Sequence, residues 1–373
     1  MLTGIYLTLL IGPTIPVPAP QPVVDALESV QVTTSAGQRS GFQLVFGLSG
    51  TSLLESLIAA GYFDPDQRVI LVATINGLPS VLCDGVITRQ DVAPNNEIGA
   101  TALTVTGEDI SLVMDLVQMN GVPHPALPDE AIVAMVLGLY ARFGLIPAII
   151  PSPFTDVPVP IDYIPTQTGT DLAYIQQLAS ENGYVFYVEP GPLPGTNVAY
   201  WGPEIRVGVP QPALNIGMDA ETNVESLSFG FDGLSREQTV ILVQDPITKL
   251  SIPVPLPDIT LLRPPLALRQ APALRIRQLC DAAKHDVIKA ATLGLSKAAA
   301  SSDAVTGQGQ LDVLRYGHVL KARGLVGVRG AGMAYDGLYY VKSVTHSIKP
   351  GEYKQSFQLA RNGLISLLPA VVP

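Results

Sequence analysis

The residues that could do chemistry are few and scattered along this chain of 373 residues. The sequence contains no nucleophile elbow, no Walker phosphate loop and no His-Glu-x-x-His zinc motif. Cys83 and Cys280 stand too far apart to suggest a metal site or a disulfide framework. The sequence therefore predicts no catalytic residue, no metal site and no cofactor, and it favours two buried thiols. The histidines are equally dispersed, at His124, His285, His318 and His346.

Two carboxylate pairs and one tryptophan are the remaining chemical candidates. Asp64 and Asp66 lie two residues apart, and Glu108 adjoins Asp109. Carboxylates so placed at a loop or helix start are usually turn formers or partners of the helix N-terminus. Trp201 could stack on a sugar, but packing beneath a loop is the commoner role of such a residue. An enzyme is therefore not favoured.

The composition indicates a protein that covers much of its surface with other protein. Hydrophobic residues make up 47% of the chain and charged residues only 14%, whereas ordinary soluble domains carry about 25% charged residues. The chain is also longer than one hydrophobic core usually serves, so two or more domains are expected.

The N-terminal segment carries no charged side chain before Asp25. A secretory signal would need an early basic residue, but the first is Arg39. The prolines from Pro13 onward end any helix well short of the roughly 20 residues that a membrane span needs. We therefore expect synthesis in the cytoplasm without a signal peptide, no membrane insertion, and a β-strand or arm that is covered by this chain or an adjacent subunit. Its candidate contact residues are Leu2, Ile5, Leu7 and Leu9.

One strand-turn-strand pattern occurs twice in the sequence. The first copy starts at Asp84-Gly85 and the second at Asp336-Gly337. In the second copy apolar and polar residues alternate from Tyr353 onward, as in a half-buried strand, and Pro350-Gly351 is a typical tight turn. Two β-units of one design predict a duplicated barrel or sandwich.

These residues resemble a known family. The stretch from Gly330 to Phe357 looks like the end of phage late-control D proteins, the baseplate hubs of contractile tails and related extracellular injection systems. The stretch from Gly169 to Val188 is similar to the helix-then-strand unit in the middle of those hubs. The similarity covers most of the chain in element order.

The resemblance implies a structural hub, a homotrimer that joins a sixfold inner tube to a threefold spike. Its partners would be the tube protein, a separate spike protein and other baseplate components, in a phage tail or tail-like particle. It also implies a mainly β, α+β fold with two similar tube-like antiparallel barrels, a helical middle domain and an inserted segment. The alternative is a tail-associated peptidoglycan hydrolase or glycan-binding module on a β-scaffold.

The pattern of the sequence divides the chain into four regions. Periodicity predicts a helix over Asp129 to Phe143, one over Asp171 to Glu181 with Thr170 as its N-cap, and one from Leu274 to about Ala300. The expected regions are a first barrel with its arm at 1–107, a middle domain at 108–205, a second barrel at 206–245 and 305–365, and a proline-rich and helical insertion at 246–304.

Charge is unevenly distributed along the chain. Residues 1–248 hold 6 basic and 25 acidic residues, whereas residues 249–373 hold 16 basic and 7 acidic residues. Attraction between the acidic half of one copy and the basic half of the next could fix the order of copies in a ring. Alternatively, each half could simply be solvated. Arg323, Arg329 and Lys354 are the candidate basic residues of such an interface. Nucleic-acid binding is not expected, because the chain is acidic overall and its basic residues do not cluster.

Overall fold

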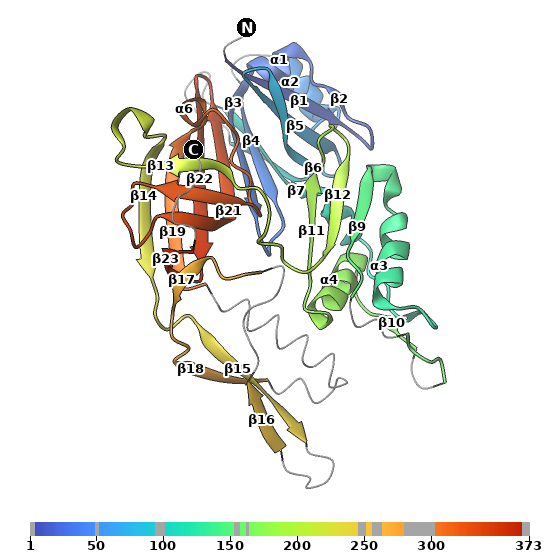
Figure 1. The fold of residues 1–373 in the computed structure, drawn as a ribbon. Coiled ribbons are helices and arrows are strands. Elements are labelled where there is room, and N and C mark those ends of the chain that lie inside the picture. Colours follow the sequence, from blue (N-terminus) through green and yellow to red (C-terminus); the bar gives the residue numbers. More distant parts are fainter. Residues whose placement is uncertain are drawn as a thin grey trace.

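Antiparallel strands dominate the structure, and its helices are few and short (Figure 1). The computed structural model describes residues 4–48, 52–93, 101–152, 157–161, 164–244, 251–255, 263–279 and 303–367. The expected mainly β, α+β fold is confirmed. Leu2 and Cys280 lie outside the described residues.

The first β-region, called the first unit here, contains six main strands. The arm predicted at the N-terminus is its strand β1, which pairs along its whole length with β5 and, at its end, with the short β2. The elements are β1 (Ile5–Gly12), β2 (Val17–Pro18), α1 (Gln21–Asp25), β3 (Leu27–Ser35), β4 (Gly41–Gly47), α2 (Ser52–Ala59), β5 (Arg68–Ile75), β6 (Leu78–Ala93) and β7 (Ala102–Asp109).

The second β-region, the second unit, has six main strands as well. It begins after the middle of the chain, is interrupted after β14 and resumes at β19. Its elements are β13 (Gln211–Asn215), the 3₁₀ turn η3 (Asp219–Glu221), β14 (Val224–Phe231), β19 (Val305–Asp312), α6 (Val313–Tyr316), β20 (Leu325–Arg329), β21 (Gly337–Lys349) and β22 (Glu352–Arg361).

The two units have the same strand order. Neighbouring strands run β3-β4-β7-β6-β5-β1 in the first unit and β14-β19-β22-β21-β20-β13 in the second. The chain visits these positions in the same sequence both times, with a short helix between the first and second strands and another between the third and fourth. The units differ in that β1 is antiparallel to β5, whereas β13 is parallel to β20. The internal repeat is therefore present in the topology.

The residues that mark the repeat in the sequence have different places in the structure. Pro350 and Gly351 connect β21 to β22, with Gly351 at φ 80°, so the predicted hairpin is confirmed. Asp84 and Gly85 do not form a turn, because they lie inside β6. A Cβ atom on Gly85 would lie 2.2 Å from the carbonyl oxygen of Glu108, so only glycine allows β7 to approach β6 this closely. In the second unit Asp336 precedes β21 and Gly337 begins it.

The two units belong to one continuous sheet. β3 of the first unit pairs with β21 of the second from Ser35 opposite Ser343 to Val30 opposite Ile348. Because of this junction the thirteen-stranded sheet runs through both units, and their buried side chains form a single core cluster. The two units thus share one sheet and one core.

The middle region packs beside the first unit with a core of its own. The helix predicted over Asp171 to Glu181 is confirmed, including its cap, since the Thr170 hydroxyl accepts a hydrogen bond from the Ala173 amide. The helix that starts at Asp129 is shorter than predicted and ends at Gly138. The elements are η1 (Ile110–Met114), β8 (Val122–Pro123), α3 (Asp129–Gly138), η2 (Ala141–Phe143), β9 (Leu145–Ile149), β10 (Thr166–Gln167), α4 (Asp171–Glu181), β11 (Val185–Pro190) and β12 (Asn197–Gly202).

A finger-like sheet projects from the second unit between β14 and β19 (Figure 1). It contains β15 (Glu237–Gln244), β16 (Ser251–Pro255) and β18 (Arg275–Leu279), while β17 (Ala267–Gln270) pairs with β23 (Gly363–Ser366) at the end of the chain. The helix predicted from Leu274 is wrong over Arg275–Leu279, which form a strand parallel to β15. The rest of that prediction lies outside the described residues.

The continuous sheet has one apolar and one polar face. Short helices cover the apolar face, because buried side chains of α1, α2 and α6 join its core cluster, among them Val23, Leu54 and Val313. On β3 the buried Val30 and Val32 alternate with the more exposed Gln31 and Thr33. The polar face is therefore the one that the short helices leave uncovered.

A buried histidine lies at the junction between the units. His346 of β21 stands opposite Val32 of β3, and its Nδ1 atom lies 2.7 Å from the Tyr353 hydroxyl. Gln355 approaches the same nitrogen at 3.3 Å and also donates to the carbonyl of Leu320. Burial lowers the pKa of His346 to about 4, so the ring is neutral at neutral pH.

We expect the stability of the subunit to fall as the pH drops from about 6.5 to about 4. Because the folded pKa of His346 lies below its ordinary value, the unfolded chain binds more protons in this window, and the full effect is about 3 kcal/mol. Denaturant unfolding of wild type and His346→Gln across this range measures it, and the variant should show a shallower pH slope. The exposed His318 supplies the control His318→Gln, whose slope should match wild type. Equal slopes for wild type and His346→Gln would contradict the assignment.

Candidate assembly interface

Several edges remain open among the described strands, and two of them, on β14 and on β6, are related to the internal junction. Among the described strands, β14 lies at one end of the sheet and pairs only with β19 (Figure 1). β6 pairs with β5 as far as Val86 and with β7 from Gly85 onward, so beyond its bulge it has only one partner among the described strands. Unpaired backbone N–H and C=O groups on such edges are ready to pair with another strand. The two open edges are therefore candidate contact surfaces.

The open edges are the repeat counterparts of the strands that meet inside the chain. β14 occupies the position of β3 in the strand order, and β6 occupies the position of β21. β6 and β21 each carry a bulge at the point where their pairing changes, between Ile87 and Arg89 and between Val341 and Ser343 respectively. Past its bulge β21 takes β3 as a second neighbour, and β6 has no equivalent neighbour in the described part of this chain.

The side chains beside the open edges include exposed apolar groups. Val92 on β6 is 46% exposed and Phe231 on β14 is 42% exposed. Both project to the apolar side of the sheet, since Val92 stands opposite the buried Leu103 and Phe231 opposite the buried Val305. Covering them would remove apolar surface from water, which stabilises a contact by about 25 cal/mol per Å².

A buried ion pair ties the first unit to the middle region. The Arg68 guanidinium donates to both carboxylate oxygens of Asp84 at 2.7 Å, and the same carboxylate accepts from the side-chain amide of Asn197 at 2.9 Å. Arg68 also donates to the carbonyls of Phe143 and Gly195 in the middle region. Both charges are almost completely shielded from solvent. Asp84 therefore positions the middle region, a role that its sequence context did not indicate.

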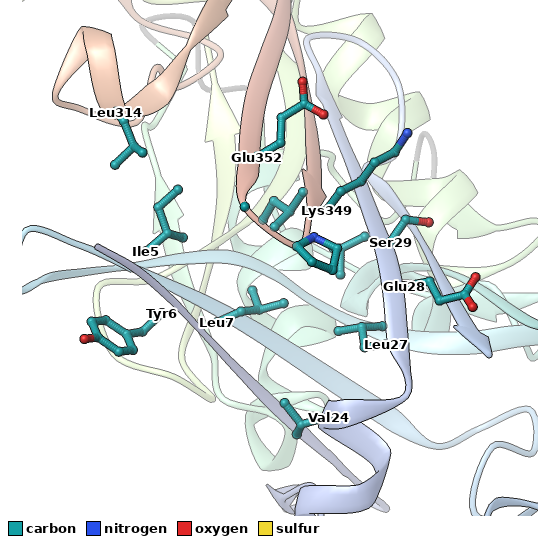
Figure 2. Close-up of a pocket in the computed structure, with 14 residues that line it drawn as sticks. Ile5, Tyr6, Leu7, Val24, Leu27, Glu28, Ser29, Leu314, Lys349 and Glu352 are labelled. Carbon is teal, nitrogen blue, oxygen red and sulfur yellow. The ribbon is translucent and has the colours of Figure 1, made fainter. Parts of the chain in front are cut away.

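A cleft of about 400 Å³ lies where the two units meet near the chain start (Figure 2). Ile5 and Leu7 of β1 line it on one side, and the β21–β22 turn with Lys349 and Glu352 lines it on the other. Ile5 and Leu7 are half-buried and pack against the core, whereas Leu9 is buried within it. The arm residues expected to be covered are thus covered by their own chain in the case of Leu9 and only partly in the case of Ile5 and Leu7.

The three basic residues selected from the sequence do not lie together on an exposed edge. Arg323 has a buried side chain, which donates to the Ser35 carbonyl and stacks on the Tyr187 ring. Arg329 lies 4.0 Å from the Glu221 carboxylate within the same chain. Lys354 pairs with two carboxylates of its own chain, those of Glu225 and Glu352. Reversing the charge of Arg323 would therefore change the fold of the subunit as well as any contact.

The residues that the sequence offered as candidates for chemistry have structural roles in the fold. Trp201 lies in β12, is completely buried and packs edge-on against Tyr184, so the packing interpretation is confirmed and its ring is closed to an external sugar. Asp109 caps η1 by accepting from the Ser111 amide, as expected for a carboxylate at a helix start. Burial raises the pKa of Asp109. Cys83 is a buried free thiol, as predicted.

The part of the chain that the structure describes holds no cluster of three or more potential metal ligands. None of the helices described there is long and apolar enough to cross a membrane.

Comparison with known proteins identifies the fold but no family. No protein-family model matches the chain, and no curated protein matches it either. Among solved structures, a tail protein from Neisseria meningitidis MC58 aligns with a TM-score of 0.64 at 14% identity, covering 97% of this chain and 98% of that one. The 43 kDa tail protein of prophage MuSo2 from Shewanella oneidensis aligns with a TM-score of 0.60 at 14% identity, covering 95% and 98%.

A third structure comes from a secretion system. The E. coli c3393 protein, described as a component of the type VI secretion system, aligns with a TM-score of 0.56 at 12% identity, covering 93% of this chain and 77% of that one. At these identities the likeness concerns the fold. The chain has, over nearly its whole length, the fold of solved phage tail proteins and of a type VI secretion component.

Replacing Arg68 should destabilise the subunit severely. The variant Arg68→Met leaves the Asp84 carboxylate buried without its cation, and such broken pairs cost about 3–5 kcal/mol. The matched control is Arg89→Met, which removes an exposed pair with Asp91 and should cost only about 0–1 kcal/mol. Denaturant unfolding of the purified subunits measures both. Similar losses for the two variants would show that Arg68 does not hold the middle region.

Proposed function

We propose that this chain is the hub subunit of a contractile-tail baseplate or a related injection particle. Three copies would form a ring that joins a sixfold inner tube to a threefold spike. The fold likeness to tail proteins over 97% of the chain supports a tail role, and the duplicated unit supports the symmetry, because three copies of two similar units present six. The resemblance to late-control D hubs points the same way.

The observation that carries this proposal is the pairing of β3 with β21. It is a contact between one unit and the next, made inside one chain along six residue pairs. The same contact between two copies would use the counterpart strands, with β14 of one copy added beside β6 of the next. Both of these edges are open among the described strands of the single chain. Repeating the contact places every unit between two others. If the rotation closes after six units, the ring contains three chains, because each chain contributes two units.

The internal junction also supplies the register of the contact between copies. Aligning the bulges of β21 and β6, and those of β3 and β14, matches Ser343 to Arg89 and Ser29 to Ser226. Ala93 of one copy then stands opposite Ser228 of the next. On the apolar side Val92 would cover Phe229.

The next pairs in this register are chemically compatible as well. Gln90 would stand opposite the exposed Phe231, and Arg89 opposite Asp232, which gives an ion pair across the contact. Exposed apolar side chains are covered and opposite charges meet, so the register agrees with the surface of the single chain.

The proposed partners follow from the hub role. They are two further copies of this chain, the inner tube protein, a separate spike protein and other baseplate components, assembled in a tail or tail-like particle. The arrangement uses no cofactor and no catalytic residue. A cell-wall hydrolase or glycan-binding module gains no support from Trp201, the residue considered as a platform for a sugar, because it is buried.

A disulfide placed in the proposed register should link copies into covalent trimers. We would combine Ala93→Cys with Ser228→Cys in a Cys280→Ser background and oxidise the assembled protein. Directly opposite residues on paired strands have Cβ atoms about 4.5–5.5 Å apart, a spacing that a small shift brings within disulfide range. Non-reducing electrophoresis should show a ladder that ends at three copies.

The controls separate register from chance contact. Each single variant should give no ladder, and Ala93→Cys with Ser226→Cys, two residues out of register, should link far less because diagonal neighbours are about 7–8 Å apart. A ladder that extends past three copies would contradict the trimer, and efficient linking only in the shifted pair would contradict the register.

A further inference from the structure

The polar face of the continuous sheet is lined by uncharged side chains. One row of directly opposed residues crosses five strands of both units, from β14 through β19, β22 and β21 to β3. All of its members carry a hydroxyl or an amide, and the Thr33 and Thr345 hydroxyls lie 3.1 Å apart across the junction. The row consists of Ser226, Gln310, Ser356, Thr345 and Thr33.

A second row beside it has the same chemistry. It runs through Ser228, Gln308, Gln358, Ser343 and Ser35. In the first unit the face continues with the opposed residues of β3, β4 and β7, where amides and a hydroxyl again meet. Uncharged polar side chains thus cover the middle of this face in both units.

Charged side chains at the margins of this face lie beside opposite charges, and Lys349 stands opposite Glu352 in the β21–β22 pairing. Lys354 lies 3.1 Å from Glu225 and 3.0 Å from Glu352. At the β6 edge Arg89 lies 2.7 Å from Asp91. At the end of β7, Glu108 accepts from Arg39 at 2.7 Å. The face therefore carries little net charge, although the whole chain is acidic at −10.

The same face is hollowed. A depression of about 420 Å³ is lined only by residues of β14, β19, β21 and β22, which means that the sheet itself curves around it. Obligate protein contacts are usually more apolar than this, and a row of hydroxyls and amides keeps its water. The concave face has the chemistry of a wall that stays hydrated.

We propose that this concave face lines the bore of the ring and that it does not bind the polymer that passes through. The proposal rests on the trimeric hub proposed above. Unpaired wall charges would act on a polymer within about 8 Å of the wall, which is the Debye length at physiological ionic strength. They would hold a polymer of opposite charge and repel one of like charge. A wall of hydroxyls and amides with paired margins does neither, so the bore passes cargo without selecting it by charge.

The position of the face is tested by cysteine accessibility. Thr345→Cys in a Cys280→Ser background places one reactive thiol at the centre of the face, while the native Cys83 is buried. In the free subunit the new thiol should react with a small maleimide and with a large polyethylene-glycol maleimide. In the assembled ring the small reagent should still react, and the reaction with the large reagent should be lost. Ser56→Cys, on the exposed side of α2, should react with both reagents in both states.

Each alternative outcome has a distinct meaning. If the protein never assembles beyond one copy, the hub function fails first. If the ring forms but the large reagent still reaches the introduced thiol of Thr345→Cys, the face points outward, and if the small reagent is also excluded, the face is buried against protein. Either of these results overturns the inference and leaves the ring intact.

The neutrality of the wall has its own readout. An environment-sensitive dye attached to the thiol of the Thr345→Cys variant in the ring should give no saturable response to a single-stranded oligonucleotide or to oligolysine at low salt. Adding Ser356→Lys should create a saturable response to the oligonucleotide that is lost at high salt, because phosphate binding releases counterions. A saturable response of the unchanged wall to either polymer would overturn the proposal.

Discussion

The structure depends on one requirement of the backbone, that the edge of β21 beyond its bulge find a partner. Before Lys342 this strand pairs with β20, and after it the neighbour is β3, supplied by the other unit. An unpaired strand edge exposes N–H and C=O groups that must otherwise be left to water or to another chain. The second unit is therefore completed by the first, which explains why the two share one sheet and one core. The edge of β6 beyond its bulge also needs a partner, and no described strand of its own chain supplies one.

The middle region is anchored to the first unit by one buried cluster of hydrogen bonds. The Arg68 guanidinium connects two strands of that unit to two backbone carbonyls and, through Asp84, to Asn197. The two charges of such a buried pair depend on each other, because replacing either partner leaves the other charge buried and uncompensated. The first unit and the middle region are thus joined through Asp84 of β6, the strand whose far end is one of the open edges.

The sequence predicted those features that depend on neighbouring residues. Thr170 caps α4 and Gly351 closes the β21–β22 hairpin because each acts through the backbone within a few residues. The helix predicted from Leu274 failed over Arg275–Leu279 because its helical spacing was overridden by pairing with β15, a partner distant in sequence. The candidate interface was harder to predict for a related reason. A strand edge is open when no other strand pairs with it, and the pairing of every strand depends on the topology of the whole chain. The role of Asp84 was missed because its partners Arg68 and Asn197 are not its neighbours in sequence.

The charge division of the sequence has a different meaning in the folded chain. Several arginines in the second unit or just before it have buried side chains that bind groups of their own chain. Arg206, Arg323 and Arg361 are examples. Arg361 is fully buried and donates to the carbonyls of Gly363, Asp336 and Ala334, so it fixes the loop before β21 and the turn after β22. Guanidinium groups used this way do not contribute to a basic surface. In the proposed ring, the contacts between copies would therefore come mainly from backbone edges and the covering of apolar side chains, and charge would add single pairs at the rim.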